Sequence, residues 1–237
     1  MKDLLFLDTE THSDRDPMLV QLAWLDVETG ERFNKLYKPR FPIEFDAMAV
    51  HHITNEMVAD KDSFLHSADW HRLDEMLQKK ILVAHNAPFD IDVLIRQQIR
   101  VPRFIDTLRV AKHITQFDKH SLQYLRYAMG ADRPEFSELS AHDALADVLV
   151  LEAVFGKLLE ILKDVSASLF EEEWIEQMIE LSKKPVLLKK MTFGKHAGRS
   201  FIDLSMNERD YLSWMVKNIS NMDPDLEHTV KYYLSKR

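Results

Sequence analysis

The sequence lacks cysteine and is poor in glycine. The absence of cysteine from all 237 residues excludes a disulfide framework, a thiolate zinc site and a cysteine nucleophile. Only two of the five glycines, Gly194 and Gly198, lie close together, so neither a GxGxxG dinucleotide fingerprint nor a GxSxG nucleophile elbow can occur. The segment GKHAGRS (194–200) is one residue too short for a P-loop, and no histidine precedes glutamate as in an HExxH zinc site. These absences exclude dinucleotide oxidoreductases, P-loop nucleotide hydrolases, elbow-type serine hydrolases and zincin proteases.

Long apolar runs are also missing. No run approaches the roughly 18 residues that a membrane helix needs, and the N-terminal MKDLLFLDTE has no small-residue cleavage site of a signal peptide. We therefore expect a cytoplasmic protein that has no membrane partner. The net charge of −8 argues against nonspecific coating of nucleic acid by the whole molecule, but it suits a site that gathers divalent cations.

The apolar patterns predict an α/β protein. A hairpin precedes alternating strands and helices, which indicates a mixed sheet flanked by helices. The predicted helices open at Pro88, follow Ser121 and cover 141–162, the longest periodic stretch. The predicted strands cover residues 4–9, 18–27, 32–39, 81–85 and 104–108.

The charge pattern changes after residue 163. Six acidic residues and no basic ones lie between Asp164 and Glu180, and the reverse holds between Lys183 and Arg199. We therefore predict a first domain at 1–163 and a charged helix or linker at 164–188. Residues 189–237 are too aromatic for a disordered tail, and we predict a small C-terminal module that packs on the first domain or makes the chain a homo-oligomer.

Two carboxylates lie at the end of the first predicted strand. Asp8 and Glu10 are two residues apart, so on a strand both side chains point to the same face. Two adjacent carboxylates repel each other unless a cation neutralises them. A Mg²⁺ or Mn²⁺ site is an economical explanation of the pair, but for this short motif alone an ordinary acidic strand end is the more common origin.

Further carboxylates occur at two helix starts. Asp90 ends the segment HNAPFD (85–90), where a buried strand gives way to a helix. The segment HDALAD (142–147) offers His142 as a titratable base, together with two acids, Asp143 and Asp147. The two acids are four residues apart and share a helix face, so spacing does not choose between them.

Together these segments resemble the three exonuclease motifs of the DEDDh family of 3′→5′ exonucleases, the group that contains bacterial proofreading subunits. The motifs are DTE (8–10), HNAPFD (85–90) and H-x4-D (142–147), and the resemblance extends to AVHHIT (49–54) and HSLQYL (120–125). The tail resembles the C-terminal module of the exodeoxyribonuclease X subfamily through MTFGKHAGR (191–199). The resemblance implies a ribonuclease H-like fold and release of nucleoside 5′-monophosphates from DNA.

The resemblance also implies roles for individual residues. It makes His142 the general base and places Thr11, His51 and Phe89 near the terminal nucleotide of a DNA 3′ end. It implies two Mg²⁺ ions, or Mn²⁺, held by four carboxylates: Asp8, Glu10, Asp90 and Asp147.

Three alternatives stay open. The chain could be an exoribonuclease of the same family, a proofreading subunit bound to a polymerase or repair partner, or a catalytically inactive nucleic-acid-binding relative. Intact motif residues argue against the inactive relative.

The basic stretch in the tail is a predicted nucleic-acid contact. A protein of charge −8 that holds a polyanion needs positive charge supplied locally. Phe193 lies within the stretch as a stacking surface, and the alternative is a solvated linker. The predicted contact residues are Lys189, Lys190, Lys195 and Arg199.

Overall fold

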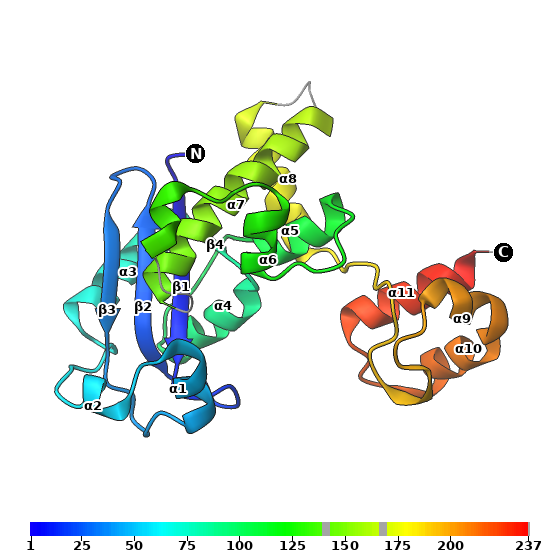
Figure 1. Ribbon diagram of the computed structural model, residues 1–237, viewed down its shortest axis with the longest axis horizontal. Helices are drawn as coiled ribbons and strands as arrows, with labels where there is room; N and C mark the ends of the chain where they lie inside the picture. The colour runs from blue at the N-terminus through cyan, green and yellow to red at the C-terminus, as the bar shows by residue number, and fades with distance from the viewer. Residues whose placement is uncertain (139–142, 166–169, 237) are drawn as a thin grey trace. The chain divides into compact units, whose positions relative to one another are not determined.

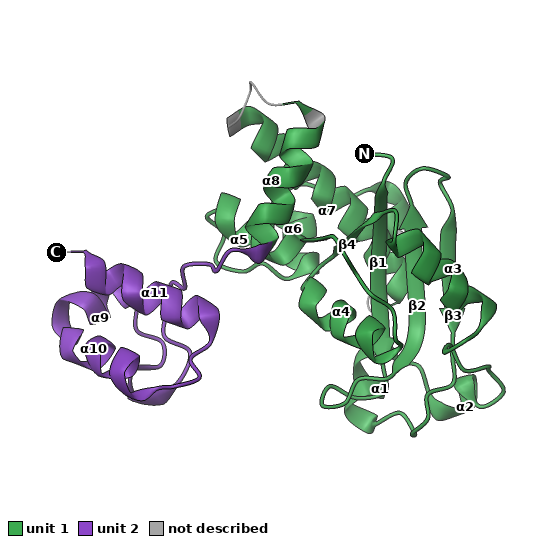
Figure 2. Cartoon of the chain, turned by 180° about the vertical axis from the view of Figure 1, so that it is seen from behind, with its two compact units in different colours: residues 1–182 green, residues 183–237 purple. Residues whose placement is uncertain are grey.

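The computed structural model describes residues 1–138, 143–165 and 170–236. The chain divides into two compact units, residues 1–182 and 183–237, which Figures 1 and 2 show as ribbons. Each unit has its own hydrophobic core and is described by itself. Among the described residues, no helix combines the length and apolar character needed to span a membrane.

The first unit is built on a five-stranded mixed sheet, as predicted. The strand order is β3-β2-β1-β4-β5, so β1 lies at the centre. β1 pairs antiparallel with β2 and parallel with β4, which in turn pairs parallel with β5. The strands are β1 (Leu4–Thr11), β2 (Leu19–Asp26), β3 (Arg32–Leu36), β4 (Ile81–Ala84) and β5 (Phe104–Asp106).

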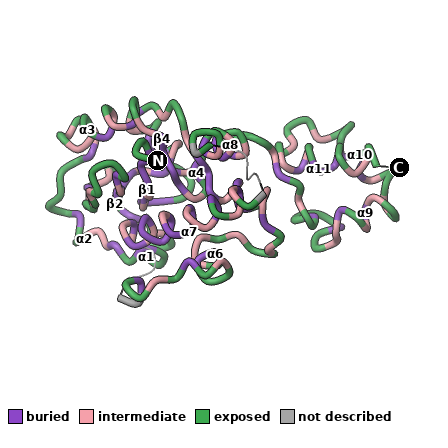
Figure 3. Tube along the Cα trace, turned by 90° about the horizontal axis from the view of Figure 1, so that it is seen from above, coloured by how far each residue is buried: buried purple, intermediate pink, exposed green. Residues whose placement is uncertain are grey.

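Helices cover both faces of this sheet (Figure 1). Leu4 and Phe6 of β1 belong to the core cluster beneath α5, α6, α7 and α8, whereas Leu5 and Leu7 belong to the cluster beneath α3 and α4. Figure 3 shows the buried residues gathered in and around the strands. The helices are α3 (Ala68–Leu77), α4 (Ala87–Arg96), α5 (Thr107–Ile114), α6 (Leu122–Ala128), α7 (Ala144–Val165) and α8 (Glu171–Lys183).

Two short helices close one end of the sheet. They are α1 (Phe45–His51) and α2 (Asn55–Val58). Val58 of α2 packs with Val20 of β2, and Ile43 and Ile53 complete this small core. The Glu44 N–H, just before α1, donates to the carbonyl of His12, which directly follows β1 (2.9 Å). These contacts fix the segment that follows the two strand carboxylates.

The segment at 164–188, predicted as a charged helix or linker, is largely helix α8 of the first unit. Its apolar residues Ile175, Met178 and Ile179 pack in the core beneath α7. The buried Ser182 hydroxyl accepts a hydrogen bond from the Asp106 N–H (2.7 Å). The acidic residues therefore mark the outer face of an amphipathic helix, and the division between units falls after Ser182 and not at residue 163.

The second unit contains three helices among its described residues. They surround a core formed by Met191, Phe201, Leu204, Leu212, Met215, Leu226 and Val230. A turn at η2 (Gly194–His196) precedes them, with both Gly194 (φ 69°) and Gly198 (φ 86°) in the left-handed region that glycine favours. The helices are α9 (Phe201–Asn207), α10 (Arg209–Asn218) and α11 (Pro224–Ser235).

Candidate metal centre

Three carboxylates meet at the end of β1. Asp8 and Glu10 share the face of β1 that α7 covers, and Asp147 lies in the first turn of α7. One oxygen from each of these three side chains lies within 4.8 Å of the others. Carboxylate oxygens at this spacing could hold a hard divalent cation such as Mg²⁺.

Asp90 approaches from the start of α4. Its carboxyl is 3% exposed and accepts a hydrogen bond from the Thr9 hydroxyl (2.8 Å). Thr9 stands between Asp8 and Glu10 along the strand, so β1 offers carboxylates on one side and an anchor for Asp90 on the other. The fourth predicted ligand is thereby held at the end of β1.

The raised pKa values of Asp8, Glu10 and Asp90 indicate a site that a cation would stabilise. Burial, followed by repulsion from Asp90, Glu10 and Asp147, raises the pKa of Asp8 well above its ordinary value. Burial and the charge of Asp147 raise the pKa of Glu10 to about 8, and burial raises the pKa of Asp90 to about 7. Without a cation the cluster therefore retains protons at neutral pH.

The two acids that spacing left unresolved have different surroundings. The Asp143 Oδ1 accepts from the Leu145 and Ala146 N–H groups (3.1 and 3.2 Å), as an N-cap of α7 does. Its Oδ2 accepts from the Gln21 side chain (3.1 Å). Asp143 is thus engaged in capping the helix, whereas Asp147 joins the carboxylate cluster.

One residue that the sequence analysis missed holds Asp147. The Gln123 Nε2 in α6 donates to the Asp147 Oδ1 (2.7 Å). A glutamine in the first turn of an amphipathic helix carries no signal of such a role. The contact exists only because α6 packs on α7, which is a tertiary feature.

His142, the predicted general base, lies outside the described residues. Asp143 begins the described segment that follows it. The role of His142 stays a prediction.

The three residues predicted near the terminal nucleotide lie close to the carboxylates in sequence or in space. The His51 Nδ1 accepts from the Ile53 N–H (3.0 Å), so its Nε2 carries the proton and donates to the Thr11 carbonyl (3.1 Å). The Thr11 hydroxyl donates to the Ser13 carbonyl (3.2 Å). His51 thereby ties α1 to the end of β1, and Phe89 is half-buried against the core beneath α4.

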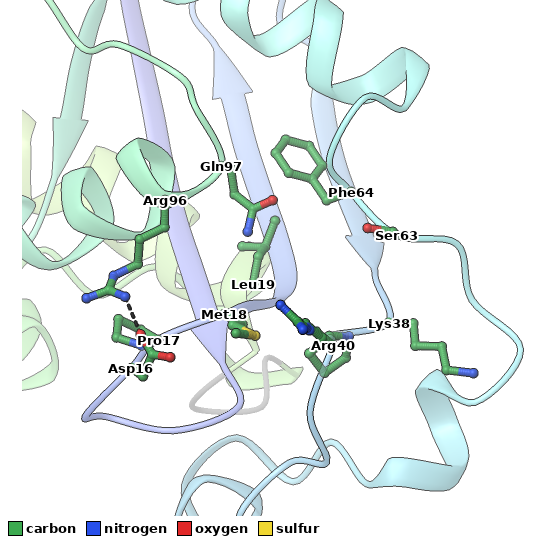
Figure 4. Close-up of a pocket in the computed structure, with 11 residues that line it drawn as sticks. Asp16, Pro17, Met18, Leu19, Lys38, Arg40, Ser63, Phe64, Arg96 and Gln97 are labelled. Atoms are coloured by element: carbon green, nitrogen blue, oxygen red, sulfur yellow. Dashed lines mark hydrogen bonds and ion pairs between the residues drawn. The ribbon is translucent and has the colours of Figure 1, made fainter.

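A pocket of about 190 Å³ lies apart from the carboxylates (Figure 4). Its wall includes Arg96 of α4, whose guanidinium points toward Asp16 and forms an ion pair with it. The Arg96 Nε also pairs with Asp92 on the same helix (2.8 Å). These contacts hold the loop that follows β1 against α4 and add no carboxylate to the candidate metal centre.

The predicted basic contacts of the tail have unequal surroundings. Arg199 is committed internally, with its Nε donating to Asp203 (2.7 Å) and its Nη1 to Glu208 (3.2 Å). Lys195 is exposed, and its Nζ lies 5.0 Å from the centre of the Tyr211 ring. Lys189 and Lys190 are also exposed, and Lys190 forms an isolated β-bridge with Ser200.

The chain is similar to known nucleases. The Exonuclease family (RNase_T) matches residues 5–155. Exodeoxyribonuclease 10 of Escherichia coli K12 is 31% identical over 98% of both chains. The epsilon subunit of DNA polymerase III from Buchnera aphidicola is 29% identical over 81% of this chain and 86% of that one.

Solved structures agree with the sequence comparisons. Exonuclease X in complex with 5′ overhanging duplex DNA superposes with a TM-score of 0.59 at 28% identity, over 76% of this chain and 99% of that one. A 3′-exonuclease that recognises the histone mRNA stem-loop superposes with a TM-score of 0.52 at 12% identity, over 66% of this chain and 81% of that one. The second likeness shows the fold alone. The first likeness and the family match confirm the predicted ribonuclease H-like class.

Proposed function

Because the chain belongs to the Exonuclease family and is a 3′→5′ exonuclease of the DEDDh type, we propose that it acts on the 3′ ends of DNA and releases nucleoside 5′-monophosphates. The observation that carries this proposal is the 31% identity to an exodeoxyribonuclease over 98% of both chains, which includes the tail. DNA with a 3′ end is therefore the proposed substrate.

The family depends on divalent metal, and the donor set of the candidate centre suits Mg²⁺. All four carboxylates offer hard oxygen ligands, and no cysteine sulfur exists in the chain. The raised pKa of Asp8 reflects burial and repulsion from the other carboxylates, both of which a cation would offset. When bound, two Mg²⁺ ions would neutralise the phosphate oxygens and lower the pKa of water, and Mn²⁺ would fit the same ligands. The proposed ligands are Asp8, Glu10, Asp90 and Asp147.

The protein's own residues complete the proposed reaction. His142 takes the proton of the attacking water, because an imidazole with an ordinary pKa near 6.5 is mostly neutral at physiological pH and can accept a proton. Thr9 keeps the Asp90 carboxylate oriented, and Gln123 does the same for Asp147. Thr11, His51 and Phe89 line the place of the terminal nucleotide.

A direct assay tests this proposal. The protein is incubated with single-stranded DNA or RNA labelled at its 5′ end, in Mg²⁺ or in EDTA. We expect a ladder of products shortened from the 3′ end, with DNA preferred and EDTA abolishing cleavage. Faster cleavage of RNA would favour the exoribonuclease alternative, and binding without cleavage in Mg²⁺ would favour an inactive relative.

The likeness to polymerase epsilon subunits supports one second candidate, a proofreading subunit. This candidate predicts a stable complex with a polymerase and a marked preference for mismatched 3′ ends. Equal rates on matched and mismatched ends by the isolated protein would argue for the free exonuclease.

A further inference from the structure

We propose that the outer face of α10 is a stacking platform for the bases of single-stranded DNA, formed by Tyr211 and Trp214 and flanked by Lys195 and Lys217. This inference deepens the proposed function, since it takes DNA as the ligand. It assigns to the C-terminal unit a role in holding a single-stranded segment of the substrate.

The two aromatic rings lie nearly parallel to each other. Tyr211 and Trp214 are three residues apart on one helix face, with ring centres 5.9 Å apart and planes within 18° of each other. The Lys195 Nζ caps the stack above Tyr211 at 5.0 Å. Lys217 follows Trp214 by another three residues and is exposed. Cations therefore flank an aromatic surface, which is the arrangement that sequence-tolerant single-strand binding uses.

Trp214 is not required for the core of its unit. The indole is 50% exposed, whereas Leu212 and Met215 of the same helix are fully buried on the opposite side. The exposed part of an aromatic side chain does not stabilise the fold. Where such a surface lies beside positive charge, it indicates a binding site. The position of Trp214 therefore suits a ligand with flat apolar faces.

Two other residues of the motif GKHAGR, His196 and Arg199, support Tyr211 from behind. His196 is buried and packs edge-on against Tyr211, with ring centres 4.5 Å apart. The Arg199 Nη1 lies 3.0 Å from the His196 Nδ1 and also holds Glu208. Arg199 is therefore part of the scaffold behind Tyr211, while Lys195 is the cation that faces solvent.

The charge of the unit suits a polyanion. Residues 183–237 contain eleven basic and six acidic residues, a net charge of +5, whereas residues 1–182 carry 20 basic and 33 acidic residues, a net charge of −13. The basic unit therefore supplies the attraction that the acidic unit cannot. Asp210 lies at the start of the same helix and is outnumbered by Lys195 and Lys217 on either side of the rings.

The test measures binding of the full-length protein to a fluorescent oligothymidylate in EDTA, where no cleavage occurs. We expect Trp214→Leu, which keeps apolar bulk but removes the ring, to weaken binding by about 5- to 150-fold, as loss of one stacked base does. Trp214→Phe should recover most of the affinity. An oligonucleotide with abasic sites should bind the parent more weakly and the Trp214→Leu variant no differently.

A matched control lies in the same unit. Tyr232 of α11 is 36% exposed and has the Lys236 Nζ 4.8 Å from its ring centre, but its aromatic neighbour Tyr233 stands at 88° to it and forms no parallel stack. Tyr232→Leu should leave binding unchanged. Equal losses for Tyr232→Leu and Trp214→Leu, or no loss for Trp214→Leu, would overturn the platform. Binding in EDTA is independent of cleavage, so failure of the nuclease assay in Mg²⁺ would contradict the proposed function alone.

Discussion

The two units of the chain differ in what their polar residues do. In the first unit, burial, together with repulsion from neighbouring acids, raises the pKa values of Glu10 and Asp90, which costs stability and creates a place for cations. In the second unit, Arg199 forms an ion pair with Asp203, and the rings of Trp214 and Tyr232 are exposed to solvent. Lysines placed among the carboxylates would neutralise them and compete with metal. Placing the basic residues in a separate unit avoids that conflict.

The largest effect should come from the carboxylates. Asp8→Asn and Asp147→Asn should abolish cleavage in Mg²⁺ while binding of oligothymidylate in EDTA stays intact, because the chemistry belongs to the first unit alone. The metal-free variants should melt no lower than the parent, since one repelling charge is gone. Initial rates, binding titrations and melting curves provide the measurements.

Asp143→Asn is the control, because asparagine caps a helix about as well as aspartate. It should cleave DNA close to the parental rate. Severe loss in Asp143→Asn together with mild loss in Asp147→Asn would reverse the assignment of the two acids.

The general base should have the next largest effect. His142→Ala should lower kcat by about 10²–10⁴-fold with little change in KM, because only proton transfer in the chemical step is lost. The acidic limb of the pH–rate profile should disappear. The control His228→Ala, at an exposed histidine of the second unit, should match the parent. An unchanged acidic limb in His142→Ala would show that another group is the base.

Removing the support of Asp147 should have a smaller effect. Gln123→Ala should lower activity by about 10–100-fold, the range typical of partners that orient a metal ligand. Raised Mg²⁺ concentration should restore part of the rate, because the defect is in holding the ligand. A Mg²⁺ dependence identical to that of the parent would contradict this role.

Deleting the second unit should have the opposite effect to these variants, since cleavage should be kept and DNA binding weakened. A chain that ends at Lys184 retains α8 and should cleave short oligonucleotides at the parental kcat, since every proposed ligand remains. Its affinity for longer DNA should fall. The slope of log affinity against log salt should become shallower by about 0.7 for each phosphate of a single strand that the second unit neutralises. An unchanged slope would mean that the basic unit does not touch the backbone.

The smallest effect concerns pH and stability of the first unit. The pKa of Glu10 is raised to about 8 from 4.5, so its proton is lost from the folded state between pH 7 and 9 while the unfolded chain has none to lose. Folding therefore weakens as pH rises through this window. The melting temperature of the metal-free chain that ends at Lys184 should drop by a few degrees from pH 7 to 9. Saturating Mg²⁺ should remove the drop, and a rise would contradict the raised pKa.

The central strand was readable from sequence because its signal is local. Apolar residues followed by acids at alternate positions predict both the buried strand and the common face of Asp8 and Glu10. The α/β class follows from the order of such segments. Both predictions depend only on neighbours along the chain.

The features that sequence could not resolve depend on packing. Spacing does not distinguish Asp143 from Asp147. They differ because the Gln21 side chain and the N–H groups at the start of α7 donate hydrogen bonds to the Asp143 carboxylate. Helix α8 resembles a linker until its apolar face is seen beneath α7. The ion pairs of Arg199 with Asp203 and Glu208 are likewise set by the fold, and its contact with DNA stays a prediction.

The alternation of β1 also limits how this strand can vary in length. Along the eight residues of β1, Leu5 and Leu7 face α3 and α4. Phe6 and the two carboxylates lie on the opposite face, which α7 covers. Insertion of one residue between Leu7 and Asp8 would leave either the carboxylates or the core side chains on the wrong face. Such an insertion would therefore damage either the metal centre or the folding of the sheet. A homologous strand that tolerates a length change should gain or lose residues in pairs.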